Sequence, residues 1–176
     1  MNFDKFIEQP KRHYLAIGEF ISAFSAVELQ LSVLMALIQG HYDRSYYIAN
    51  SFNISVSVKL KKIGLFIASL PRGERDQVEG KWLIIKRNIE ELYLERNHIV
   101  HGIGNCTFFE NTFTTILDET YEHKLVRHEH SVDSINSLTL RIRHVLTGDN
   151  GISGEFFENL KTSIISSEVK KHNVKL

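Results

Sequence analysis

The chain contains 176 residues with a mass of 20.3 kDa, which is the size of one ordinary domain and excludes two large ones. Apolar residues make up 43% and charged residues 24%, so a buried core is expected rather than a disordered tail. Lysine plus arginine equals aspartate plus glutamate, at 21 each. This balance argues against binding of nucleic acid by bulk positive charge, but it leaves a local basic cleft open. The single cysteine, Cys106, excludes an intramolecular disulfide framework and a multi-cysteine zinc site.

The charge pattern near the N-terminus favours a soluble, cytoplasmic protein. Asp4, Lys5 and Glu8 stand where a signal peptide needs an apolar segment. The longest uncharged run, 29–42, is interrupted by polar residues and is shorter than a membrane span of about 20 apolar residues. We therefore expect no membrane association.

Apolar residues recur at three- and four-residue spacing over much of the first hundred positions, which predicts helices. The first is expected over 11–39, because Pro10 suits a helix start and Gly40 suits a helix end. A short helical turn is expected over 43–52 and a second helix over 55–69. A third, longer helix is expected over 74–101.

The composition changes after Gly104, where Thr, Phe and Val become frequent. Three short segments separated by turn residues predict a small antiparallel meander, over 106–109, 113–118 and 121–130. Two more helices are expected over 131–146, capped by Ser131, and over 154–170. The fold class is mainly α, with about five helices. We expect a single domain, 1–176. It consists of a helical core over 11–104, the meander over 105–130 and C-terminal helices over 131–170.

One charged residue interrupts the apolar stripe of the 74–101 helix. The stripe alternates steps of four and three residues, and Arg96 occupies a position that the pattern assigns to the buried face. Asn97 follows it, and His101 ends the helix before Gly102. At about 100° per residue, Asn97 and His101 share a face and Arg96 lies one step aside. The three side chains span roughly 140°, which suits a groove where two copies of the helix meet about a two-fold axis.

These three residue types suit cleavage of RNA. The imidazole of His101 can accept a proton from a ribose 2′-hydroxyl or donate one to the leaving 5′-oxygen. The guanidinium of Arg96 matches the charge that grows on phosphate oxygens in the transition state. Asn97 can orient either group or bind a phosphate oxygen. Attack by the 2′-hydroxyl needs no metal, is confined to RNA and leaves a 2′,3′-cyclic phosphate.

The segment from Arg96 to His101 resembles the Arg-x4–6-His signature of the HEPN superfamily, including the polar residue directly after the arginine. The signature also stands at the end of a long helix and before a glycine, and the resemblance covers roughly 11–104. It implies an antiparallel helical bundle, here with a β-meander after the motif helix, that forms a homodimer around a composite active site. It also implies a metal-independent endoribonuclease without a cofactor, with Arg96, Asn97 and His101 as catalytic residues. Toxin–antitoxin or phage-defence roles are typical, and a minimal nucleotidyltransferase antitoxin is a candidate partner.

Two further residues are candidates for supporting roles. Glu28 lies inside the apolar stripe of the 11–39 helix, and some members of the superfamily have an early acidic residue that contacts the motif arginine. His98 stands beside the motif, although it projects about 100° from Asn97, as an ordinary helix-surface residue would. A structural interpretation stays open, in which Arg96 pairs with Glu28 between helices and His101 only caps the helix C-terminus.

Other functional classes are also open. A non-catalytic helical dimer of the same fold that binds RNA or a protein is the main alternative, and the neutral charge favours it. A metal-dependent hydrolase would use the histidine-rich strand with His123, His128 and His130. Two of these histidines with a carboxylate such as Glu122 or Glu129 could bind zinc or nickel, although no spaced ligand set accompanies them and no metal is expected. Eight basic residues are candidates for an RNA path, with half or more expected on solvated faces: Lys59, Lys61, Lys62, Lys81, Lys86, Arg87, Arg141 and Arg143.

Overall fold

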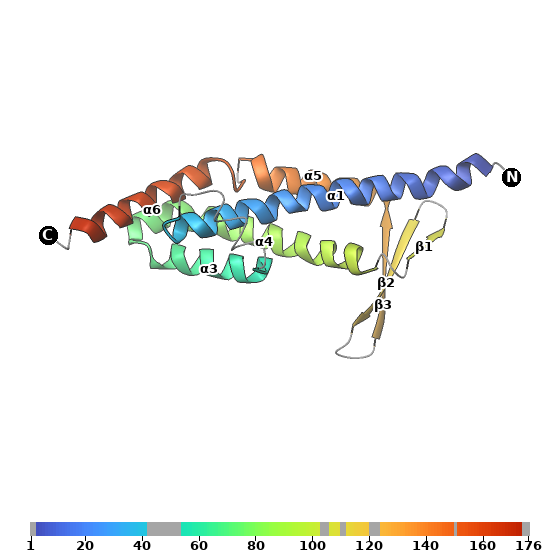
Figure 1. Cartoon of the computed structure of the whole chain (residues 1–176), viewed down its shortest axis with the longest axis horizontal. Coiled ribbons are helices and arrows are strands. Elements are labelled where there is room, and N and C mark those ends of the chain that lie inside the picture. The colour runs from blue at the N-terminus through green and yellow to red at the C-terminus, as the bar shows by residue number, and fades with distance from the viewer. Residues whose placement is uncertain are drawn as a thin grey trace. The chain divides into compact units, whose positions relative to one another are not determined.

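The structure, a computed structural model, describes residues 3–41, 54–102, 106–109, 112–119, 124–149 and 151–173. Within these ranges it has five helices, namely α1 (Phe3–Ile38), α3 (Val56–Ser69), α4 (Arg72–Gly102), α5 (Val132–Thr147) and α6 (Glu155–Asn173) (Figure 1). The prediction of a mainly helical chain is therefore confirmed. The helical turn predicted over 43–52 lies outside the described residues.

The main error in the predicted helix boundaries concerns Pro10. Helix α1 begins at Phe3, so Pro10 lies inside the helix and does not start it. The φ angle of proline is compatible with helix. An interior proline costs one backbone hydrogen bond and crowds the carbonyl four residues earlier, yet a helix can continue past it, so a favoured position at a helix start does not fix the boundary. Ser55 caps α3 as a side-chain acceptor for the backbone N–H of Val58, at 3.4 Å. At the other end of α1, Gly40 has a φ of 74°, a left-handed conformation that favours glycine.

Three strands follow α4 and form one antiparallel sheet in the order β1-β2-β3. They are β1 (Cys106–Phe109), β2 (Thr112–Glu119) and β3 (Lys124–Ser131). In β3, His128 pairs with Thr115 and His130 pairs with Phe113 across the ladder from β2. Because side chains alternate along a strand, His128 and His130 belong to the same face of β3. Ser131 then caps α5, where its Oγ accepts the backbone N–H of Ser134 at 3.0 Å.

The chain divides into two compact units, which are described separately. Unit 1 comprises 1–24 and 91–142, and unit 2 comprises 25–90 and 143–176. The division falls inside α1, α4 and α5, so each of these helices contributes one part to each unit.

Unit 2 is a bundle of helical segments from α1, α3, α4 and α6 around an apolar core. The rings of Trp82 on α4 and Phe156 on α6 stack with centroids 5.8 Å apart. Gly64 lets Trp82 lie close to α3, because an added Cβ would lie 3.3 Å from the indole Nε1. The other fully buried apolar side chains of this core include Val27, Leu31, Leu34, Leu60, Ile63, Val78, Ile85, Ile89 and Leu160. Ile165 on α6 is exposed.

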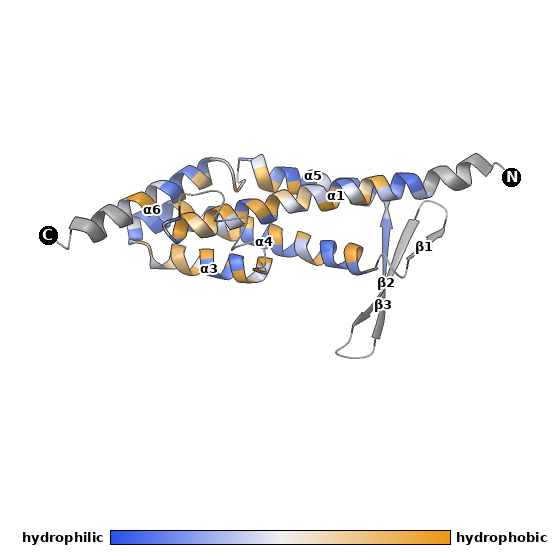
Figure 2. Ribbon diagram, in the orientation of Figure 1, coloured by the Kyte–Doolittle hydropathy of each residue, from blue (hydrophilic) through white to orange (hydrophobic). Residues whose placement is uncertain are grey.

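Unit 1 contains the end of α4 that carries the candidate motif. Its buried apolar residues come from the N-terminal part of α1, the C-terminal part of α4 and α5, and they include Ile17, Phe20, Phe24, Leu92, Ile99, Ile135 and Ile142. Figure 2 shows apolar and polar residues alternating along these helices, as expected for segments that bury one face.

One stretch of α1, Pro10–Ile38, is long and apolar enough to cross a membrane by length and composition. Within the part of the chain that the structure describes, it is the one such helix, and 44% of its apolar window is buried inside the protein. The core helix of a soluble protein meets the same criterion, as does a signal sequence near the N-terminus.

Lys59 is buried in unit 2, contrary to its predicted place on an RNA path. Its side chain is 3% exposed, and its Nζ lies 3.5 Å from the main-chain oxygen of Glu28. The sequence carries a signal for this burial, because Lys59 stands three residues after Val56 and four before Ile63, both of which are buried. Burial lowers the pKa of the Lys59 amine below 10.5, while the nearby Glu28 carboxylate raises it.

The buried amine makes stability depend on pH in the alkaline range. The folded pKa is lowered, so between that value and 10.5 the unfolded chain binds more protons, and the free energy of unfolding rises with pH. We expect Lys59→Met to remove this rise and to be at least as stable as the wild type at neutral pH. Urea unfolding at neutral and alkaline pH tests this, with Lys62→Met on the exposed side of α3 as the control. An unchanged pH dependence in Lys59→Met would contradict the assignment.

Candidate functional site

Arg96 and Asn97 form a connected pair near the end of α4. Both side chains are half-buried, and Arg96 Nη1 donates a hydrogen bond to Asn97 Oδ1 at 3.1 Å. The amide oxygen therefore takes one guanidinium donor, and the remaining donors of Arg96 keep the planar, paired arrangement that suits phosphate oxygens. In this geometry Asn97 restrains the orientation of the guanidinium.

His101 lies in the last turn of α4 and is exposed to solvent. The carbonyl oxygens at a helix C-terminus have no intrahelical partner, so the end of α4 presents backbone acceptors beside this side chain. An exposed imidazole is also accessible to a large substrate. Among these three residues the structure thus provides a restrained cation and an accessible titratable group on one helix end.

Contacts with other elements of unit 1 fix the last turns of α4. Tyr93 stacks on Phe24 of α1, with ring centroids 6.2 Å apart. On the α5 side, Arg141 Nη2 donates to Glu91 Oε2 at 2.7 Å. These contacts join α4 to α1 and α5 about one turn before Arg96.

Glu28 does not belong to the same unit as the motif. It lies in unit 2, whereas Arg96 lies in unit 1, so the suggested contact between them stays a prediction. Within unit 2 the main-chain oxygen of Glu28 accepts a hydrogen bond from Ser32 Oγ at 2.8 Å and faces Lys59 Nζ. Its described neighbours are thus those of a helix-packing position.

His98 is half-buried against the sheet, which corrects its expected place on the helix surface. Its ring stacks on that of His128 in β3, with centroids 3.8 Å apart and planes 23° apart. The ring of His128 in turn stacks on the ring of His130, with centroids 6.4 Å apart. Strand alternation groups His128 with His130, but the packing of β3 on α4 has no signal in the local sequence pattern. The histidine cluster of His98, His128 and His130 therefore could not be predicted as a unit.

The histidine cluster is arranged as a stack of rings. In the described part of the chain, no group of three or more His, Cys, Asp or Glu residues has a geometry that could hold a metal ion. His123 and Glu122, two of the suggested ligands, lie outside the described residues. Nδ1 of His98, Nε2 of His128 and Nε2 of His130 are each shielded from solvent. Face-to-face packing of imidazoles is favourable when the rings are neutral, because two imidazolium ions at this distance repel each other.

The histidine cluster predicts acid sensitivity. Burial lowers the pKa of His130 below 6.5; the Glu95 carboxylate raises it, and the imidazoles of His128 and His98 lower it. Below pH 6.5 the unfolded chain then binds more protons than the folded chain, so stability is lost as the pH falls. The free energy of unfolding should fall by up to about 1.4 kcal/mol per pH unit for one such proton.

His130→Gln removes this titration and should flatten the decline of stability between about pH 7 and about pH 5. Chemical denaturation followed by circular dichroism at several pH values gives the slope. The control is His144→Gln, since His144 is an exposed histidine on α5. Equal slopes for the wild type and His130→Gln would show that His130 does not carry the effect.

The basic residues suggested for an RNA path are partly engaged in ion pairs. Lys81 Nζ lies 2.6 Å from Glu155 Oε2, and Lys86 Nζ lies 3.3 Å from Glu90 Oε1. Arg141 pairs with Glu91, and Lys59 is buried. Fewer basic residues are therefore left to attract RNA along this path, because a paired cation attracts phosphate less strongly than an isolated one.

Comparison of the chain with models of protein families, with curated proteins and with solved structures finds no match.

Proposed function

We propose that this chain is a metal-independent endoribonuclease of the HEPN type that acts as a homodimer. The observation that carries the proposal is Arg96, a half-buried arginine in an otherwise apolar helix stripe, hydrogen-bonded to Asn97 and followed by the exposed, helix-terminal His101. Partial burial of this cation costs some desolvation, and the hydrogen bond to Asn97 holds it in one orientation beside the helix end. The mainly helical chain, with a small sheet after the motif helix, supports a HEPN-like fold.

In the proposed reaction, a ribose 2′-hydroxyl attacks the adjacent phosphorus atom and the bond to the leaving 5′-oxygen breaks. His101 transfers the proton, either from the 2′-hydroxyl or to the 5′-oxygen. Arg96 stabilises the charge on the nonbridging oxygens, and Asn97 holds the guanidinium in place. The products are a 2′,3′-cyclic phosphate and a free 5′-hydroxyl. Two protomers would contribute these residues to one shared cleft.

The experiment is RNA cleavage by the wild-type protein in excess chelator. We expect a mixed RNA substrate to be cut with 2′,3′-cyclic phosphate ends, because the nucleophile belongs to the substrate. The matched control substrate carries a 2′-O-methyl group at each cleaved position and should stay intact. No cleavage of any RNA, or cleavage that chelator abolishes, would overturn the proposal.

The wider role follows from the same chemistry. A soluble, cytoplasmic ribonuclease of this kind would arrest growth, as a toxin or a phage-defence effector does. A minimal nucleotidyltransferase encoded nearby would then be the natural antitoxin. Expression in a bacterium should arrest growth, and His101→Ala should relieve the arrest.

The second candidate function is a non-catalytic dimer of the same fold that binds RNA or a protein. The zero net charge and the pairing of Lys81, Lys86 and Arg141 with carboxylates favour it. This candidate predicts growth and RNA integrity that do not depend on His101. RNA binding measured at several salt concentrations then tests for an RNA ligand, since binding through phosphate contacts weakens steeply with salt.

A further inference from the structure

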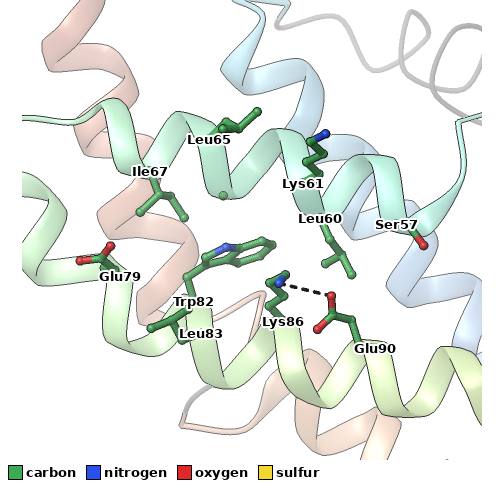
Figure 3. A pocket seen from close by; sticks show the side chains of 11 residues that line it. Ser57, Leu60, Lys61, Leu65, Ile67, Glu79, Trp82, Leu83, Lys86 and Glu90 are labelled. Carbon is green, nitrogen blue, oxygen red and sulfur yellow. Dashed lines mark ion pairs between the residues drawn. The ribbon is translucent and has the colours of Figure 1, made fainter.

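An open groove of about 360 Å³ lies between α3 and α4 within unit 2. Trp82 extends from α4 toward α3, and Leu60 and Ile67 extend from α3 toward α4, so the floor is apolar (Figure 3). Leu65 on α3 and Leu83 on α4 line the groove and are 62% and 59% exposed. Two exposed leucines beside an apolar floor leave a face whose burial would be favourable.

Charged residues continue this face along α4: Glu79, Lys86 and Glu90 line the groove, and Arg75 lies one turn before Glu79 on the same side of the helix. They are defined here as the charge stripe: Arg75, Glu79, Lys86 and Glu90. At about 100° per residue, the charge stripe and Leu83 fall within an arc of roughly 80° on α4. Along the helix a positive and a negative residue are followed by Leu83 and then by another positive and another negative residue. Each half of the charge stripe is an internal pair, with Arg75 Nε 3.8 Å from Glu79 Oε2 and Lys86 Nζ 3.3 Å from Glu90 Oε1.

This order of charges is complementary to itself when a second copy of α4 runs antiparallel. A two-fold axis that passes between positions 82 and 83 exchanges position 79 with 86 and position 75 with 90. Glu79 of one protomer then faces Lys86 of the other, and Arg75 faces Glu90. The leucines at position 83 meet near the axis, beside the apolar floor of the groove. A parallel arrangement would oppose like charges instead, so the pattern selects one orientation.

We propose that the α3–α4 groove is an isologous self-association surface, with a second copy of this chain as its occupant. Burial of Leu83 and Leu65 supplies the attraction, and the charge stripe sets the antiparallel register. The surface contains none of Arg96, Asn97 or His101. It is therefore a contact additional to the one proposed for the catalytic cleft, and it stands or falls independently of the ribonuclease proposal.

Two variants with a charge stripe of one sign test the register. In the positive variant Glu79→Lys and Glu90→Lys make all four residues basic, and in the negative variant Arg75→Glu and Lys86→Glu make them acidic. Each variant repels itself across the proposed contact, whereas a mixture restores every opposite pair. Sedimentation equilibrium should show that the mixture associates at least about tenfold more tightly than either variant alone, with the difference reduced in high salt.

A second pair of variants tests the apolar centre. Leu83→Lys should weaken association of the wild-type sequence at least about tenfold. The control is Ile84→Lys on the same turn of α4, because Ile84 is 49% exposed and does not line the groove. None of these variants changes the end of α4 that carries Arg96 and His101, so association through that region contributes equally to every measurement. Equal association of the mixture and the single-sign variants, or equal effects of Leu83→Lys and Ile84→Lys, would overturn the proposal.

Discussion

Arg96→Ala and His101→Ala are each expected to lower the rate of RNA cleavage by about 10²–10³-fold. The arginine supplies donors to charge that develops only in the transition state, so its loss should reduce kcat more than it raises KM. Arg96→Lys keeps the charge but loses the planar, paired donors, and it should recover only part of the rate. Single-turnover cleavage of a labelled RNA in excess chelator measures these differences directly.

The controls for this experiment come from the same helix and from an equivalent helix end. Arg72→Ala removes an exposed arginine at the start of α4, and His144→Ala removes an exposed histidine in the last turn of α5. Both should cleave RNA at the wild-type rate. Because Arg96 is half-buried, thermal unfolding of Arg96→Ala must first show that the chain is folded. Cleavage by folded Arg96→Ala at the wild-type rate would show that Arg96 takes no part in the reaction and would overturn the proposed site.

Asn97→Ala offers a narrower test of the same site. Its side chain accepts from Arg96 Nη1, so its loss leaves the guanidinium charge in place and removes only the restraint. A positioning residue of this kind should cost less rate than Arg96 itself, and Asn97→Asp should keep an acceptor at the same place. If Asn97→Ala lowers the rate and Asn97→Asp restores it, Asn97 acts by orienting Arg96, because a carboxylate accepts from the guanidinium but would repel a phosphate oxygen.

The helices could be predicted because their signals are local. In α4, Val78, Trp82, Ile85 and Ile89 recur at steps of four and three, and all are buried, so a periodic pattern was enough to find the helix and its core face. The start of α1 could not be predicted in the same way. Pro10 is tolerated inside that helix, and the rule that places proline at a helix start expresses only a preference.

The candidate site was only partly predictable, since some of its contacts join distant segments. Arg96 and His101 stand out from the stripe and from the helix end, which are properties of one helix. The stacking of His98 on His128 depends on how β3 packs against α4, and no pattern within either segment contains that information. Lys59 lies between these cases. It occupied a stripe position as Arg96 did, but its charge favoured an interpretation as a surface residue.

Phe156→Ala is expected to lower the free energy of unfolding by about 3–5 kcal/mol, a large share of the stability of an ordinary domain. Phe156 is fully buried, and its ring stacks on Trp82, so truncation removes apolar contacts and leaves a cavity between α4 and α6. For a chain of this size, the loss corresponds to a fall in melting temperature of roughly 6–20 °C. Phe157→Ala is the matched control, because Phe157 is the next residue and is only half-buried.

The same variant can be observed at a single site, since Trp82 is the one tryptophan of the chain. Trp82 is 2% exposed; its indole stacks on Phe156 and forms part of the floor of the α3–α4 groove. Loss of the Phe156 ring should let water reach the indole and move the Trp82 emission to longer wavelength before global unfolding. Because Trp82 also lines the groove, Phe156→Ala should weaken self-association, while Phe157→Ala should leave it unchanged. A destabilisation below about 1 kcal/mol with unshifted emission would contradict the packing of α6 on α4.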